Sequence, residues 1–185
     1  MSRGRSKPRG KKINPKLWVF CEGESEATYV SYLRSKYRLP SIKIISKVTG
    51  ASISEREIRN HKTGEASHEK DKTFLMYDGD LLEVISRLKQ IANVDLLITT
   101  PCLELWYLLH YTNHRTALTS AACEQKLKQK CISYKKGVIS SELKMALDKN
   151  IDQACLRVKT TELFKNPSSN IYEFTEMLEQ INRLK

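Results

Sequence analysis

Short apolar segments alternate with helix-forming stretches over residues 17–112. This alternation limits the possible folds of the chain more than any other feature of the sequence. Apolar segments rich in β-forming residues occupy residues 16–21, 42–48, 72–77 and 94–99. Apolar residues at helical spacing follow the first and third of these segments. Repeated strand-helix-strand units form right-handed crossovers between parallel strands. We therefore expect an α/β fold with a mostly parallel four-stranded sheet flanked by helices.

The rest of the chain predicts a helical C-terminal region. Helices are expected over residues 120–131, 140–147, 152–165 and 171–184, and a turn over residues 166–170. With 185 residues, of which 40% are hydrophobic, the chain suits one domain. We place that domain at residues 17–185, with an α/β core over residues 17–112 and a helical extension over residues 113–185.

Three smaller elements can be predicted from local signals. Ser25 has the side chain of a helix N-cap and is expected to begin the helix after the first strand. Thr100 and Pro101 predict the start of another helix, because a hydroxyl cap followed by proline is favoured there. A short helix is expected near residues 54–60, inside the polar stretch of residues 49–71.

The net charge of +11 is concentrated at the N-terminus. Residues 1–16 have no acidic side chain and seven basic ones, Arg3, Arg5, Lys7, Arg9, Lys11, Lys12 and Lys16. Lacking apolar residues between Met1 and Ile13, this tail cannot bury surface and is expected to be disordered alone. Basic side chains that neutralise phosphates release counterions, so the tail suits nucleic acid. A solvated tail that aids solubility is the alternative.

Composition also bears on the compartment. The longest apolar stretches fall far short of the roughly 18 residues that span a bilayer, and the basic N-terminus lacks the apolar centre of a secretory signal. We expect a cytoplasmic protein without a membrane segment. The cysteines Cys21, Cys102, Cys123, Cys131 and Cys155 are odd in number and form no C-x-x-C pair. They are expected to be reduced and mostly buried.

Acidic residues follow two of the predicted strands. Glu22 comes directly after the first strand, and Asp78 and Asp80 come after the third. The carboxyl ends of parallel strands are where such sheets bind ligands. In extended backbone Asp78 and Asp80 share a face, and Gly79 between them allows a close approach. Clustered carboxylates suit Mg²⁺ or Mn²⁺, which could support phosphodiester hydrolysis. Solvated or helix-capping aspartates are the alternative.

One pattern of strands and acidic residues and two further segments carry a resemblance to known families. A strand, Glu-Gly, a turn and a helix, followed by a strand and Asp-x-Asp, resemble the Toprim domain. Residues 100–110, TPCLELWYLLH, resemble the NPCFELWLLLHF block of the RloB-like family. Residues 166–172 resemble that family's C-terminal NPS motif. The resemblance extends from Leu17 to the C-terminus, and its P-C-x-E-L-W block is the specific part.

The resemblance implies a function. The RloB-like family is associated with bacterial phage defence, abortive infection and restriction loci, often beside an ABC-type or AAA-type ATPase. In such a Toprim domain Glu22, Asp78 and Asp80 gather around catalytic Mg²⁺, with Glu26 and Glu104 as additional acidic groups. The chain departs from the family pattern at two positions: Thr100 replaces the usual Asn, and Gly79 replaces the usual Arg.

Several candidate site residues have two possible interpretations. Glu104 also suits the positive end of a helix dipole as a structural residue. His110 is a candidate general acid or phosphate ligand, or a zinc ligand with His114, although a core-packed or surface histidine explains it too. Lys47 on the second strand could place a cation near a phosphate. The lysines Lys126, Lys128, Lys130, Lys135 and Lys136 fit a phosphate track or a solvated helix face.

Two functions of different classes follow. The first is a cytoplasmic Mg²⁺-dependent or Mn²⁺-dependent endonuclease acting on DNA or RNA, as the effector of an anti-phage system with an ATPase partner. The second is a non-catalytic nucleic-acid-binding or adaptor module in which the acidic pocket holds a structural metal. The sequence does not choose between DNA and RNA, and a homo-oligomer remains open.

Overall fold

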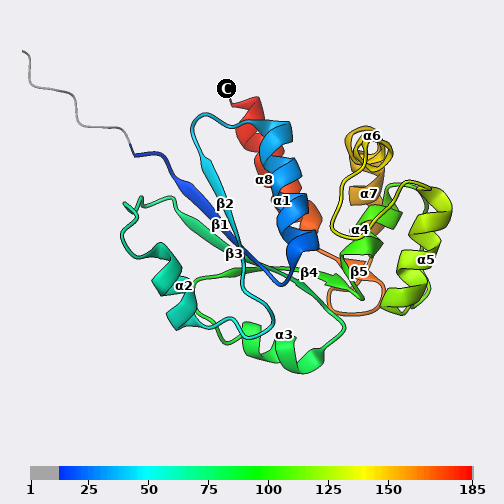
Figure 1. The fold of residues 1–185 in the computed structure, drawn as a ribbon, viewed down its shortest axis with the longest axis horizontal. Coiled ribbons are helices and arrows are strands. Elements are labelled where there is room, and N and C mark those ends of the chain that lie inside the picture. Colours follow the sequence, from blue (N-terminus) through cyan, green and yellow to red (C-terminus); the bar gives the residue numbers. More distant parts are fainter. Residues whose placement is uncertain (1–12, 185) are drawn as a thin grey trace, which may run out of the picture.

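Five strands form one sheet in the order β2-β1-β3-β4-β5 (Figure 1). The computed structural model describes residues 13–184. The strands β1 (Lys16–Cys21), β2 (Lys43–Val48), β3 (Lys72–Asp78) and β4 (Asp95–Thr100) are parallel. The predicted mostly parallel α/β sheet is confirmed, and the arrangement is consistent with a Toprim-like fold.

A fifth strand was not predicted. β5 (Ser168–Ser169) pairs antiparallel with β4. Asn170 continues this pairing with its side chain, since Oδ1 accepts from Ile98 N at 2.7 Å and Nδ2 donates to Leu96 O at 2.7 Å. Asn, Pro and Ser are typical turn residues, so the local sequence predicted only a turn. The C-terminal segment is thereby joined to the sheet.

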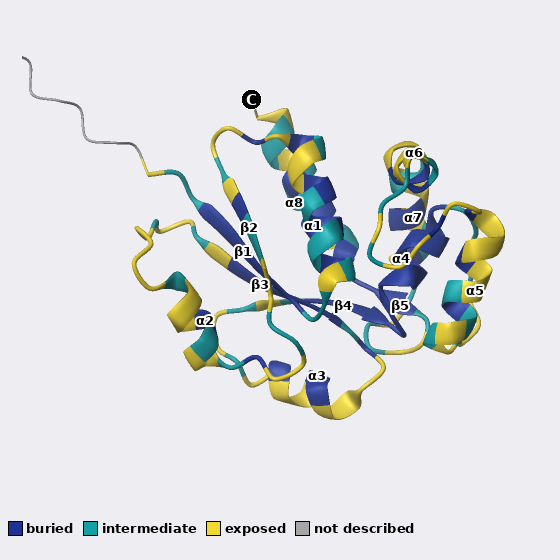
Figure 2. Cartoon of the chain, viewed as in Figure 1, coloured by how far each residue is buried: buried dark blue, intermediate teal, exposed yellow. Residues whose placement is uncertain are grey.

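Helices cover both faces of the sheet (Figure 1). They are α1 (Glu24–Tyr37), α2 (Glu55–Lys62), α3 (Leu82–Leu88), α4 (Leu103–Leu109), α5 (Ser120–Lys130), α6 (Ser141–Lys149), α7 (Ile151–Val158) and α8 (Ile171–Arg183). The side chains of β1 alternate: Leu17 and Val19 pack with the cluster of α1, α4 and α8, whereas Trp18 packs with α2 and α3. Figure 2 shows the central strands buried between these layers, as expected for a parallel sheet.

Several predicted helix boundaries were wrong. α1 begins after Gly23 rather than Ser25, because the Glu26 side chain accepts a hydrogen bond from Gly23 N at 2.9 Å. α4 begins after Cys102 rather than at Pro101, because Thr100 is the last residue of β4. α7 ends at Val158, seven residues before the predicted end. Ser54 caps α2 as an N-cap, which agrees with the short helix predicted there.

The predictions on the N-terminal tail fall mainly on residues 1–12, outside the described residues, so Arg3, Arg5, Lys7, Arg9, Lys11 and Lys12 are not placed. Lys16 belongs to the sheet rather than to the predicted tail: it begins β1, is 6% exposed and forms an ion pair with Glu65 at 2.9 Å. The five cysteines are free and buried, as predicted. Between residues 13 and 184, no helix combines the length and the apolar character needed to cross a membrane.

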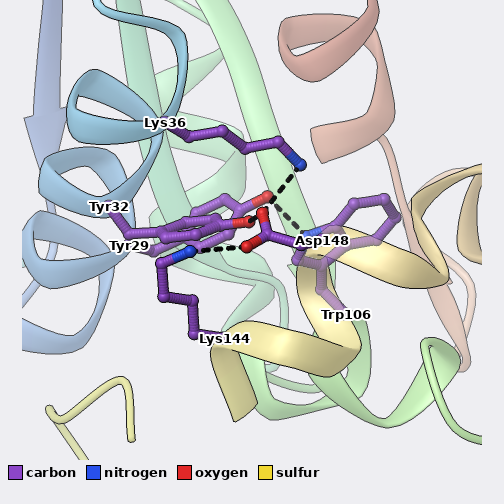
Figure 3. A network of polar contacts seen from close by, with 6 residues as sticks. All are labelled: Tyr29, Tyr32, Lys36, Trp106, Lys144 and Asp148. Atoms are coloured by element: carbon purple, nitrogen blue, oxygen red, sulfur yellow. Dashed lines mark hydrogen bonds and ion pairs between the residues drawn. The ribbon is translucent and has the colours of Figure 1, made fainter. Parts of the chain in front are cut away.

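A polar network joins α1 to α4 and α6 beside the core (Figure 3). Trp106 Nε1 donates to Tyr29 OH at 2.7 Å, within the core. Asp148 accepts from Tyr32 OH at 2.7 Å and pairs with Lys36 at 3.2 Å and Lys144 at 2.6 Å. Burial raises the pKa of Asp148, but these three partners outweigh it and lower the pKa to about 2.

Asp148→Asn should therefore lower the free energy of unfolding by about 1 kcal/mol at neutral pH, since a carboxylate 35% exposed is partly screened. A lowered pKa stabilises the fold above the unfolded value near 4, and this contribution is lost as pH falls toward about 2. Urea denaturation at neutral pH and between these two values measures both effects. Asp95→Asn, at an exposed strand end, is the matched control. An equal loss in both variants would contradict the role given to the network.

Candidate functional site

An acidic cleft opens at the carboxyl ends of β1 and β3. Its volume is about 400 Å³, and it is lined by Glu22, Gly23, Glu24, Ser25, Glu26, Asp78, Glu104, Lys136 and Gly137. Five of these nine residues are acidic and one is basic. They come from the ends of two neighbouring strands, the first turns of α1 and α4, and the loop between α5 and α6. The cleft lies where a parallel sheet places its ligand site.

Glu22 and Asp78 are held in this cleft by hydrogen bonds with the backbone. Asp78 N donates to Glu22 Oε2 at 3.1 Å, which ties the end of β1 to the end of β3. Leu103 N donates to Asp78 Oδ1 at 2.9 Å, which ties β3 to the first turn of α4. The two carboxylates are thus fixed by the same contacts that join three elements of the fold.

Glu26 and Glu104 are the buried acidic groups of the cleft. Glu26 is 6% exposed and accepts from Gly23 N, whereas Glu104 is 3% exposed and accepts from Tyr134 OH at 2.6 Å. Buried carboxylates are costly unless they are paired or hydrogen-bonded. Each of these two carboxylates accepts a hydrogen bond from an uncharged donor. These bonds therefore do not neutralise the acidic side chains of the cleft.

The electrostatics of the cleft reflect this excess of negative charge. Burial, followed by the carboxylates of Glu26, Glu22 and Glu104, raises the pKa of Asp78 to about 8 despite the hydrogen bond from Leu103 N. Burial also raises the pKa of Glu26. Glu104, and to a lesser degree Asp78, raise the pKa of Lys136. A cation in the cleft would relieve the repulsion among these carboxylates.

The donors of the cleft fit a hard divalent cation in their chemistry. Carboxylate oxygens are the ligands that Mg²⁺ prefers, and Mn²⁺ accepts the same set. Across residues 13–184, no three Asp, Glu, His or Cys side chains are already gathered as a metal-binding group. We therefore regard the donor set as suitable but not preassembled, so that binding would require some carboxylates of the cleft to turn toward a common ion.

Asp80 does not line the cleft. The chain bends at Gly79 and Asp80, so the expected common face of Asp78 and Asp80 in extended backbone is not formed. The side chain of Asp80 is exposed, and Ser120 Oγ donates to its Oδ2 at 3.5 Å. Asp80 thus lies at the surface beside the start of α5.

Two other candidates also lie outside the cleft. Lys47 is exposed on β2. His110 is 1% exposed, its Nδ1 lies 2.8 Å from Trp106 O, and its ring packs edge-on against the Trp106 indole. Burial lowers the pKa of His110 to about 4. The structure thus places His110 in the core, which agrees with the alternative interpretation of a core-packed histidine. Trp106 and Tyr107 are buried in the same core.

The place of Lys136 in the cleft was not predicted. The sequence grouped it only with neighbouring lysines, and no local signal brings residue 136 to residues 78 and 104. Gly137, with φ of 73°, and a bridge between Lys135 and Val138 shape a tight loop. Thr28 Oγ1 donates to Gly137 O at 3.2 Å and holds this loop against α1. Tyr134, the partner of Glu104, was missed for the same reason.

Comparison with known proteins agrees with the resemblance stated above. No curated protein and no solved structure matches the chain. The family model described as RloB-like protein matches residues 17–178, from β1 into α8. This match covers the five strands except Lys16, the first residue of β1, and every residue of the acidic cleft. The chain belongs to the RloB-like protein family.

Proposed function

We propose that the chain is a metal-dependent nuclease that hydrolyses phosphodiester bonds in DNA or RNA with Mg²⁺ or Mn²⁺. The observation that carries the proposal is the acidic cleft, in which Glu22, Glu26, Asp78 and Glu104 from four separate elements meet beside Lys136. Burial and the neighbouring carboxylates raise the pKa of Asp78 to about 8, so its charged form is unfavourable in the cleft without a cation. Such strongly perturbed groups in a cleft are typical of functional sites.

The residues of the cleft would have different roles in phosphodiester hydrolysis. When bound, a divalent cation supplies charge stabilisation at the phosphate and a more acidic water. Glu22 and Asp78 would hold it, because hydrogen bonds from the backbone already fix their two carboxylates. Glu26 and Glu104 would complete the ligand set or accept a proton. Lys136 would neutralise charge on the phosphate oxygens. Asp80, at the surface beside Ser120, would contact the substrate outside the cleft.

We further propose that this nuclease is the effector of a bacterial anti-phage system working with an ABC-type or AAA-type ATPase. Membership of the RloB-like family supports this proposal through the setting in which that family occurs. A gene for such an ATPase beside the gene for this chain, and co-purification of the two products, are the expected observations. Purification of the chain without any ATPase from its own host would contradict the partnership but not the chemistry.

Cleavage of labelled nucleic acid tests the proposed activity. Purified protein should cut DNA or RNA with Mg²⁺ or Mn²⁺, and a chelator should stop it. Glu104→Gln should lower the rate by about a hundred-fold, because it removes one charge from the cleft while keeping an acceptor for Tyr134. Glu69→Gln, in an exposed loop, is the matched control that also reports a contaminating nuclease. Equal cleavage by both variants would contradict the proposal.

A further inference from the structure

We propose that α5 and the loop after it form a phosphate track that guides a nucleic-acid strand to the acidic cleft. The track is defined by Lys126, Lys130 and Lys135, and it leads to Lys136 in the cleft. This inference rests on the proposed function, because it assigns the surface that receives the substrate. Its ligand is the phosphodiester backbone, which DNA and RNA share.

The start of α5 lies beside Asp80, and the loop after α5 reaches Glu104. At the start of α5, Ser120 Oγ contacts Asp80 at 3.5 Å. In the loop after α5, Tyr134 OH donates to Glu104 and Lys136 lines the cleft. Figure 1 shows α5 beside α4, the helix that carries Glu104. A strand bound along α5 would therefore have the cleft within reach.

Three lysines on α5 and in the loop after it carry positive charge that no carboxylate of the described chain neutralises. Lys126, Lys130 and Lys135 are exposed and form no ion pair within residues 13–184, whereas Lys128 pairs with Glu124 at 2.6 Å. On α6 and the segment after α7, Lys144, Lys159 and Lys165 each pair with a carboxylate at 2.6 Å, whereas Lys149 at the end of α6 forms no ion pair within residues 13–184. The charge on α5 is thus available to an external anion, and the partner it fits is a polyanion.

The backbone that carries these lysines is fixed by packing against the core and by hydrogen bonds. Cys123 and Leu127 are fully buried on the inner side of α5, and Cys131 is buried at its end. The bridge between Lys135 and Val138 and the hydrogen bond from Thr28 to Gly137 fix the following loop. A fixed support lowers the ordering cost when side chains bind a ligand.

Spacing also fits a nucleic-acid backbone. Lys126 and Lys130 lie one helical turn apart, about 6 Å along the axis, and the 11 residues of α5 span about 16 Å. One strand of duplex DNA carries a phosphate about every 3.4 Å of axis, so α5 covers about five phosphates. Flexible lysine side chains can reach phosphates within that length.

A charge-matched pair of triple variants tests the track in the full chain. The track variant is Lys126→Gln, Lys130→Gln and Lys135→Gln. The control is Lys43→Gln, Lys70→Gln and Lys72→Gln, which removes the same charge from exposed sites near the amino ends of β2 and β3, opposite the cleft. Binding to labelled duplex DNA and duplex RNA is measured by fluorescence anisotropy in a chelator across a range of salt. The N-terminal tail is present in every protein and cancels in the comparison.

The track variant should bind roughly ten-fold more weakly at moderate salt, and the slope of log affinity against log salt should fall by about 2 to 3. A loss with only one of the two duplexes would identify which nucleic acid uses the track. The same affinity and slope in the track and control variants would overturn the track, even if the parent cleaves. A specific loss of binding without cleavage by the parent would uphold the track and contradict the nuclease function instead.

Discussion

Replacing Asp78 with asparagine should lower the rate of metal-dependent cleavage by about a thousand-fold. Asparagine has nearly the same shape and keeps an Oδ1 acceptor for Leu103 N, whose bond to Asp78 is 2.9 Å long. The change therefore removes the ionisable carboxyl group of Asp78 from the cleft with little change in packing. Single-turnover cleavage of a labelled duplex measures the effect, and Asp95→Asn is the control at a solvent-exposed strand end.

The same variant should remain folded. Burial and the neighbouring carboxylates already raise the pKa of Asp78 to about 8, so its charge is unfavourable in the protein without a cation. Thermal unfolding in a chelator should show Asp78→Asn to be as stable as the parent. A variant that is folded and cleaves at the parental rate would remove Asp78 from the chemistry. A variant that is inactive only because it unfolds would give no support to the assigned role, and would contradict the stability expected here.

Gly79→Ala should lower the free energy of unfolding by about 3 kcal/mol. A Cβ at residue 79 would overlap the Thr100 hydroxyl and would lie 3.0 Å from Ile98 Cγ2, and both neighbours belong to β4. Glycine is needed here for space, because Gly79 N also bonds Thr99 O at 2.8 Å and fixes the backbone against β4. Urea denaturation of the purified variant measures the loss.

A double-mutant cycle separates this clash from a general effect of alanine. Thr100→Ala removes the overlapping hydroxyl, so Gly79→Ala should cost less in that background than in the parent. The Thr100 hydroxyl is buried and has no hydrogen-bond partner in the described chain, which makes its removal mild. Additive effects of the two changes would contradict the proposed contact.

Much of the fold could be predicted because its signals are local. The apolar strands, the short helix after Ser54 and the acidic residues at two strand ends follow from patterns within a few residues. The cleft location follows from one further rule, that parallel strands present their carboxyl ends at one edge. Glu22, Glu26, Asp78, Asp80 and Glu104 were placed together on this basis and on the family resemblance, and the cleft contains all of them except Asp80.

What the sequence missed depends on contacts between distant residues. β5 exists because Asn170 pairs with β4, more than 70 positions away in the chain. Lys136 reaches the cleft because Thr28 holds its loop, 109 positions apart in sequence. The predicted common face of Asp78 and Asp80 assumed extended backbone beyond β3, but the chain bends at Gly79. Such turns are set by neighbouring strands, which local patterns do not reveal.

Calorimetric titration of the purified, chelator-treated protein with Mn²⁺ tests the central claim most directly. The account predicts saturable uptake by the parent and a loss of at least ten-fold in affinity for Glu22→Gln and Asp78→Asn, with Asp95→Asn unchanged. Parental protein that takes up no Mn²⁺ or Mg²⁺, or uptake that these two substitutions leave unchanged, would contradict the assignment of the acidic cleft as a metal-dependent hydrolytic centre.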